Sequence, residues 1–250
     1  MKLKVLRADP AGNITLFVIS RVKKSDYASV AKRLMSMERF KAEQVGFIHN
    51  GRMDMEAGEF CGNASRAYGM LVARQQGITG KVSVAVSGCD HPLSVRVTKN
   101  TAECEMPLPL WIKQVPVKEK HHTLVHLGGI AHLIVEDIEP SEVFFAEAEP
   151  IFRDMKELEA YGVIFLNGDH MTPLVKVPAT NTLFWEGSCG SGTLAAQIAR
   201  SEEQPDGVFS GAFIQPAGAV TAKVTRRGGK IVSAKIGGPV TLEDPIEIEI

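Results

Sequence analysis

Two cysteines stand in nearly the same short motif, about half a chain length apart. The first lies in "GEFCGNASRA" and the second in "EGSCGSGTLA". Each cysteine precedes a segment with helical periodicity, so its thiol is expected at a helix N-terminus, where free backbone N–H groups and the helix dipole favour the thiolate. The glycine that follows lets these N–H groups approach an anion closely. Each motif is therefore suited to hold a small carboxylate beside a reactive sulfur.

Two such motifs predict acid/base chemistry at carbon. If the two halves fold against each other, Cys61 and Cys189 face one cleft from opposite sides. Stereoinversion needs this arrangement, because one group removes a proton and the other returns one to the opposite face. The two titrations are then coupled, since one sulfur is a thiolate while its partner is a thiol. The alternative for either cysteine alone is a small packing residue at a tight turn.

The elements that must position these motifs follow the same order in both halves. Strands, a helix, strands, a second helix and further strands predict an α+β fold in which sheets wrap around helices. Pro107 and Pro109 interrupt the pattern, so the lobes are expected over residues 1–112 and 113–250, and a return of the last strand to the first lobe is left open. The expected helices are 26–35 with Ser25 as cap, 65–77 ending at Gly77, 140–155 and 191–202. The expected strands are 2–9, 14–20, 44–50, 81–88, 93–107, 123–129, 131–137, 162–167, 181–187, 211–218, 219–238 and 245–250.

Composition narrows the range of partners. The 250 residues carry 28 basic and 29 acidic side chains, which gives a formal net charge of −1. No field of one sign therefore recruits nucleic acid or a membrane surface, and a small neutral or zwitterionic partner, such as a free amino acid, is expected. No apolar run has the length of a membrane span or a secretory signal, which favours a cytoplasmic protein. The sequence leaves open whether the protein forms a homodimer.

The other chemical signals in the sequence are weaker. The four cysteines contain no C-x-x-C pair, and Cys89 and Cys104 lie in strand-like stretches where packing is the favoured role. No lysine follows "GSCGSG" at the position of a nucleotide-binding loop. The histidines His121, His122 and His126 favour a solvated strand over a metal site, so no metal is predicted. Trp185 is expected in the core or in a cleft wall. No cofactor is predicted either.

The paired motifs resemble those of the diaminopimelate epimerase family of cofactor-independent, two-thiol racemases. "CGNA" at Cys61 to Ala64 and "CGSGT" at Cys189 to Thr193 carry the resemblance, supported by Gly12-Asn13, "GGIAH" and "IQPAG". It covers nearly the whole chain. The resemblance implies two pseudo-symmetric lobes, each a β-sheet wrapped around a central helix, with the active site between them.

The resemblance also implies roles for individual residues. Cys61 and Cys189 would be the acid/base pair. Apart from the resemblance, His132 is either a neighbour supporting a cysteine or a satisfied core histidine. Glu186 would take the α-amino group of the substrate. The α-carboxylate would rest chiefly on backbone N–H groups, and further side chains would line the pocket. These positions are Gly62, Asn63, Gly190 and Ser191 for the carboxylate, and Asn13 and Gln44 for the pocket.

The substrate is indicated by departures from the family pattern. Ile130 and Ile164 replace asparagines that grip the distal end of diaminopimelate, and the arginine loop before the second cysteine is missing. A distal zwitterion would be buried unpaired at a cost of several kcal/mol. "EQVGFI", "VSGC" and "WEGSCGSGT" resemble the histidine racemase branch that serves staphylopine-type metallophore synthesis, which implies conversion of L-histidine to D-histidine. Glu43 would then face the imidazole or be a solvated charge. Diaminopimelate epimerase, hydroxyproline epimerase and a non-catalytic amino-acid-binding or redox-sensing protein remain alternatives.

Overall fold

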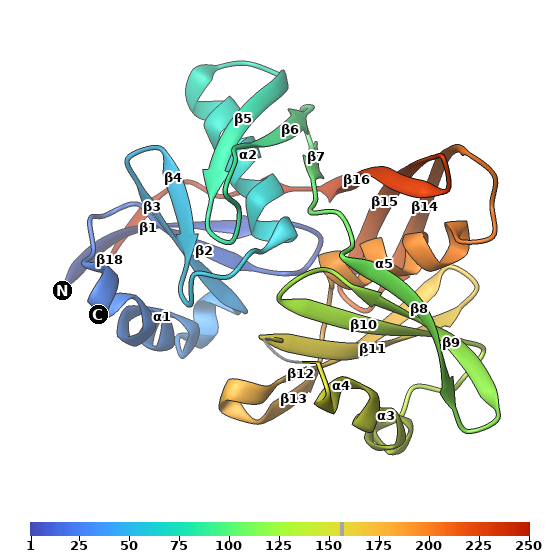
Figure 1. Cartoon of the computed structure of the whole chain (residues 1–250). Coiled ribbons are helices and arrows are strands. Elements are labelled where there is room, and N and C mark those ends of the chain that lie inside the picture. The colour runs from blue at the N-terminus through green and yellow to red at the C-terminus, as the bar shows by residue number, and fades with distance from the viewer. Residues whose placement is uncertain (156–157) are drawn as a thin grey trace. The chain divides into compact units, whose positions relative to one another are not determined.

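The chain forms a mixed α+β structure in which strands predominate (Figure 1). The structure is a computed structural model that describes residues 1–155 and 158–250. It contains two compact units. The first is built from Met1–Glu105 and Gly237–Ile250, and the second from Met106–Ile236. The predicted α+β class is confirmed.

The first unit contains one mixed sheet. Its strands are β1 (Lys2–Asp9), β2 (Thr15–Val18), β3 (Gln44–His49), β4 (Arg52–Met55), β5 (Gly80–Val86), β6 (Leu93–Val97), β7 (Thr101–Glu105), β17 (Thr241–Leu242) and β18 (Ile246–Glu249). The order of pairing is β18, β1, β2, β3, β4, β5, β6, β7, and β17 also pairs with β1. All pairs are antiparallel except β2 with β3 and β4 with β5. The two ends of the chain therefore share the strand pair β1–β18.

A helix covers each face of this sheet. Strand β1 shows why, because successive side chains point to opposite faces. Leu6 joins the core around α2 (Gly62–Gln76), whereas Leu3 and Val5 join a second core around α1 (Tyr27–Met35). Helix α2 is buried along most of its length and contacts β5, β6 and β7. The helix that follows the first cysteine motif is thus the centre of the main core of this unit.

The second unit is also built around a helix that follows a cysteine motif. Its strands are β8 (Trp111–Val117), β9 (Lys120–His126), β10 (Ile130–Glu136), β11 (Ala160–Asn167), β12 (His170–Val177), β13 (Thr182–Trp185), β14 (Gly207–Gln215), β15 (Gly218–Arg227) and β16 (Lys230–Pro239), the last of which continues into the first unit. Strands β8 to β13 pair in chain order, with β10 and β11 parallel, and β14 pairs with β12 and β15. Helix α5 (Gly190–Ser201) contacts strands β9, β10, β11, β14 and β15. Helices α3 (Glu142–Ala148) and α4 (Pro150–Arg153) belong to a separate core.

Several expected elements are corrected by the structure. The 3₁₀ turn Lys24–Asp26 precedes α1, and no side chain caps that helix, so the expected cap by Ser25 is wrong. The single helix expected over 140–155 is two helices, with Pro150 at the start of the second, because proline has no N–H to continue the first. Strands β4, β8 and β12 were not expected. The predicted stop of α2 at Gly77 is confirmed, since this residue has φ 65°.

The helices of the described residues are all too short or too polar to cross a membrane.

Candidate active site

Cys61 is the N-cap residue of α2. Its backbone is extended, with φ −127° and ψ 112°, and its Sγ accepts a hydrogen bond from the Ala64 N–H at 3.4 Å. Its carbonyl accepts bonds from the N–H of Ser65 at 2.9 Å and from the hydroxyl of Ser65 at 2.7 Å. The sulfur therefore takes the place that an oxygen has in an ordinary helix cap.

Cys189 caps α5 in the same manner. Its backbone has φ −114° and ψ 109°, and its Sγ accepts from the Gly192 N–H at 3.3 Å. Its carbonyl accepts from the N–H of Thr193 at 3.0 Å and from the hydroxyl of Thr193 at 2.6 Å. The repeated motif in the sequence thus corresponds to a repeated local structure, in which helix N–H groups surround each sulfur.

Four polar side chains form a network beside Cys61. Gln44 donates through Nε2 to the Asn13 Oδ1 and to the Thr15 Oγ1, each at 2.8 Å. Asn13 donates through Nδ2 to the Glu43 Oε2 at 2.6 Å. The Gln44 side chain also hydrogen-bonds the Cys61 thiol, which by itself lowers the pKa of that thiol. Asn13, Gln44 and Glu43 therefore lie together at the first cysteine.

Glu43 combines features of both roles considered for it. The residue is exposed and precedes β3, as a solvated charge would. Desolvation nevertheless raises the pKa of its carboxyl group, against the opposing effect of the hydrogen bond from Asn13. The carboxylate is thus fixed by Asn13 within the Cys61 network while it keeps access to solvent.

Gly62 and Asn63 form the first turn of α2, and both are buried. The Asn63 Oδ1 accepts from the Nε of Arg66 at 3.1 Å. Arg66 itself is completely buried, although it was not among the predicted site residues. Its charge in the otherwise apolar run "SRAYGMLV" is the signal that could have identified it.

Gln215 at the end of β14 fixes the backbone of Cys189. Its Oε1 accepts from the Cys189 N–H at 2.7 Å, and its Nε2 donates to the Thr193 Oγ1 at 2.9 Å. Because Thr193 in turn donates to the Cys189 carbonyl, both polar groups of the Cys189 backbone have fixed partners. In the sequence, Gln215 belonged only to a turn-like "IQPAG", and nothing there identified this contact.

His132 is connected to Cys189 through Ser191. The Nε2 of His132 lies 2.8 Å from the Ser191 Oγ, which lies 3.5 Å from the Cys189 Sγ. His132 has no exposed surface, and burial lowers its pKa to about 3, so the ring is neutral. Its Nδ1 has no hydrogen-bond partner within the described residues. The ring is therefore not a satisfied core histidine, and its bonded nitrogen is directed at the Ser191 hydroxyl.

Burial dominates the ionisation of both candidate thiols. It raises the pKa of the Cys61 thiol to about 11, and it raises the pKa of the Cys189 thiol well above the usual range. The N–H groups of the helix starts lower both values, but by less than desolvation raises them. The helix starts therefore favour the thiolate, as expected, but in the free protein desolvation outweighs this effect at both sulfurs.

Glu186 interacts with the Cys189 thiol. Its negative charge and its hydrogen bond to the sulfur both add to the rise in the pKa of Cys189. The hydroxyl of Ser191 and the N–H of Gly192 act in the opposite direction. Cys189 thus has an acceptor for its thiol proton and two donors for its thiolate, which suits a group that must exist in both states.

The close contacts of Gly192 yield a test of this geometry. A Cβ built on Gly192 would lie 2.6 Å from the Ile164 Cδ1 and 3.1 Å from the Cys189 Sγ. We expect Gly192→Ala to displace the sulfur and lower kcat by about tenfold or more, since small misplacements of reacting groups are costly. Steady-state kinetics of amino-acid racemisation measure the change in kcat.

Ala64, which occupies the corresponding position of the first motif, provides the matched control for that test. Ala64→Gly gives the first motif the glycine that the second motif has at this position. Its effect on kcat should be below about threefold, because the change removes one methyl group and adds no clash. Equal losses in the two variants would contradict a steric effect at Cys189.

The structure corrects several expectations about other residues named in the sequence analysis. His122 is buried against the ring of Phe144, not solvated. Trp185 is 42% exposed at its place in β13, so it is not a core residue. Cys89 lies in the turn between β5 and β6 and not in a strand, whereas Cys104 is buried in β7 as a packing residue. Within the described residues, no group of metal-ligating side chains comes together.

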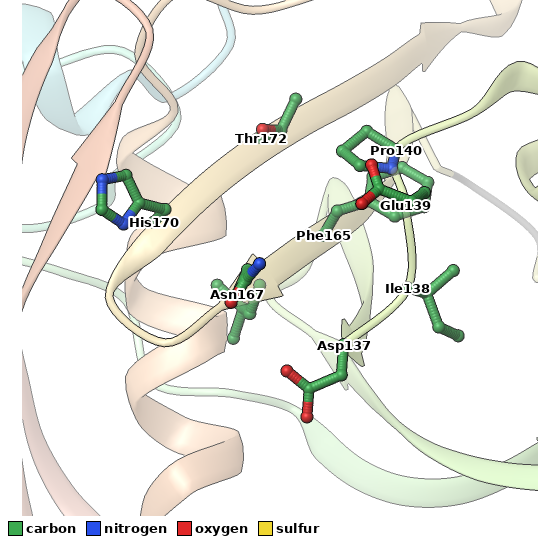
Figure 2. Close-up of a pocket in the computed structure, with 9 residues that line it drawn as sticks. Asp137, Ile138, Glu139, Pro140, Phe165, Asn167, His170 and Thr172 are labelled. Carbon is green, nitrogen blue, oxygen red and sulfur yellow. The ribbon is translucent and has the colours of Figure 1, made fainter.

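A cavity of about 210 Å³ in the second unit is separate from the cysteine motifs. Figure 2 shows that its side chains come from the loop after β10 and from the hairpin of β11 and β12. None of the predicted site residues lines it. The lining residues are Asp137, Ile138, Glu139, Pro140, Phe165, Leu166, Asn167, His170 and Thr172.

Comparisons with known proteins agree on one class. A family model described as "Histidine racemase CntK N-terminal domain" matches residues 2–244. A histidine racemase from Fusobacterium nucleatum is 32% identical over 77% of this chain and 78% of its own, and one from Staphylococcus aureus is 28% identical over 93% and 92%. The crystal structure of a hydroxyproline epimerase from Agrobacterium vitis with bound trans-4-hydroxy-L-proline has the same fold, with a TM-score of 0.60, 10% identity and coverage of 99% of this chain and 92% of that one.

The histidine racemase relatives define an isomerase, specifically an amino-acid racemase. Because the family model covers almost the whole chain, the assignment can be made narrower. The chain belongs to the histidine racemase family.

Proposed function

We propose that the protein interconverts L-histidine and D-histidine without a cofactor, with Cys61 and Cys189 as its two acid/base groups. The observation that carries the proposal is the repeated cap: each sulfur starts a helix and accepts an N–H bond from the third residue after it. A packing cysteine needs no such donors. Two thiols held in this way in a racemase family support direct proton transfer at the α-carbon.

The proton cycle needs one thiolate and one thiol. The thiolate removes the α-proton of one enantiomer and becomes a thiol, while the opposite thiol protonates the other face and becomes the thiolate. Glu186 supplies the initial ionisation, because it can accept the Cys189 proton in an exchange that leaves the net charge of the pair unchanged. Ser191 and Gly192 then donate hydrogen bonds to the sulfur, and His132 supports the Ser191 hydroxyl. In this proposal Glu186 serves the thiol first, with the α-ammonium of the substrate as a second partner.

The substrate carboxylate would bind at the helix starts. Gly62 and Asn63 in α2, and Gly190 and Ser191 in α5, present the first-turn N–H groups that a helix leaves unpaired. Positive helix ends also stabilise the negative charge that develops when the α-proton leaves. We propose two such lobes acting on one substrate, in the pseudo-symmetric arrangement that the sequence implies.

The side-chain selectivity would come from the Asn13, Glu43 and Gln44 network. Glu43 carries a fixed carboxylate that still meets solvent, which suits an imidazole N–H. The fully buried Ile164 lies in contact with Gly192, where it offers nothing to a distal charged group. These two features favour histidine over diaminopimelate.

The use of the product is a further part of the proposal. D-Histidine would be a building block for a staphylopine-type opine metallophore, which the family resemblance supports. Genes for an opine synthase and a nicotianamine-synthase-like enzyme beside this gene would support this use.

Exchange with solvent deuterium tests the function. L-Histidine, L-proline, trans-4-hydroxy-L-proline and diaminopimelate are each incubated with the reduced protein in D₂O, and α-deuteration and chirality are measured. We expect deuterated D-histidine from histidine and at least about tenfold slower exchange for the others, since a mismatched side chain leaves polar groups unpaired. An α-proton of histidine that does not exchange would contradict the proposal and would indicate an amino-acid-binding or redox-sensing protein.

A further inference from the structure

Arg66 is a charged residue whose burial is not explained by an ion pair. It has no exposed surface and lies on α2 five residues after Cys61. Its guanidinium donates to the Asn63 Oδ1 at 3.1 Å, and to the carbonyls of Pro10 and Pro239, each at 2.8 Å. All three acceptors are neutral, and no carboxylate of the described residues lies within ion-pair distance. A buried cation without an anionic partner is costly.

Two of the three bonds of Arg66 reach segments beside the first cysteine. Asn63 is the second residue after Cys61, and its oxygen is occupied by Arg66, which fixes the orientation of its amide. Pro10 opens the turn that carries Asn13, a member of the network beside the thiol. Arg66 thus holds two segments that surround the same sulfur.

The second motif has no such cation. Leu194 lies five residues after Cys189, as Arg66 does after Cys61, and it is also completely buried. A carboxylate raises the pKa of each thiol, Glu186 at Cys189 and Glu59 at Cys61, so the buried cation is what distinguishes the first motif. The two sulfurs therefore have electrostatically different surroundings despite their identical caps.

We propose that Arg66 is a positioning residue that provides the fixed buried positive charge against which the Cys61 thiolate forms. It acts through space on the sulfur and through Asn63 and the Pro10 carbonyl on the groups around it. Burial lowers the pKa of Arg66, and Cys61, followed by Cys104 and Asp9, opposes this decrease, so an anion at Cys61 favours the charged guanidinium. This role depends on the proposed function only in that Cys61 cycles through a thiolate.

Thiol alkylation tests the proposal without reference to turnover. Iodoacetamide modification of Cys61 is followed by peptide mass spectrometry between pH 8 and pH 11 in the wild type, Arg66→Met, Arg66→Lys and Arg74→Met. Arg74 lies on the same helix but is exposed and pairs with Asp244, so its loss controls for removal of one α2 cation. At pH values below the pKa of the Cys61 thiol, we expect Arg66→Met to slow Cys61 alkylation by about tenfold. This loss corresponds to a rise of one unit in the pKa of that thiol. Arg66→Lys and Arg74→Met should stay within about threefold of the wild type, because the buried charge remains in both.

The outcomes separate charge from shape. Unchanged alkylation in folded Arg66→Met would overturn the proposal, and so would an equal slowing in Arg66→Lys. If Arg66→Met does not fold, Arg66→Lys decides, since retained Cys61 reactivity supports the charge and a tenfold loss contradicts it. Failure of both variants to fold would assign Arg66 to folding alone. If the wild type does not racemise histidine, the proposed function fails, whereas the alkylation result still judges Arg66.

Discussion

Replacing either Cys61 or Cys189 with serine will lower histidine racemisation by about 10²- to 10⁴-fold, the usual contribution of a general acid or base. A serine hydroxyl keeps a cap oxygen for the helix, so the fold should persist. Its proton is held far more tightly than a thiol proton, so it cannot take the thiolate role. Circular dichroism and chiral product analysis measure both effects on the same samples.

Cys89→Ser is the matched control for these variants. Cys89 is partly exposed in the turn between β5 and β6 and caps no helix. The turnover of Cys89→Ser should remain within about twofold of the wild type, as is usual for surface substitutions. Near-normal turnover in either Cys61→Ser or Cys189→Ser would contradict the two-thiol assignment.

Glu186→Gln will make the Cys189 thiol more acidic and will lower the rate of racemisation. The Glu186 carboxylate raises the pKa of Cys189, so removing its charge lowers that pKa and should increase alkylation of the thiol at a given pH. The same change removes the acceptor for the thiol proton, so racemisation should decrease by about 10²-fold or more. Alkylation and turnover are thus expected to change in opposite directions.

Glu202→Gln is the corresponding control in the same unit. Glu202 pairs with Arg226 and has no described contact with the cysteine motif. Both alkylation of Cys189 and turnover should stay close to the wild type. A parallel decrease of both quantities in Glu186→Gln would indicate that Glu186 only maintains the structure around the sulfur.

The local structure of the two motifs was predictable because it depends on neighbouring residues. A cysteine before a helical period, followed by glycine and small residues, was sufficient to predict a thiol near each helix N-terminus, although α2 begins at Gly62 and not at the expected Ser65. The α+β class followed from the order of elements. Asn13 and Gln44 could be placed only by resemblance to a family, since they lie in separate turns and strands.

The remaining features depend on contacts between distant segments. Gln215 contacts Cys189 from β14, and His132 contacts Ser191 from β10. Because each contact joins distant segments, no local sequence pattern predicts it. The net ionisation of the thiols could not be predicted for the same reason: the helix start is a local property, whereas desolvation depends on everything packed around the sulfur. Strand β8 was missed because Pro116 lies inside it, although an edge position tolerates proline.

The central claim is that two different sulfurs act on the two faces of one α-carbon, and the position of the isotope tests it most directly. L-Histidine is racemised in D₂O to low conversion, and both enantiomers are isolated. If two groups act, D-histidine carries α-deuterium while the recovered L-histidine keeps its α-proton. Equal deuterium in both enantiomers at early times would mean that a single group serves both faces, and the account would be contradicted.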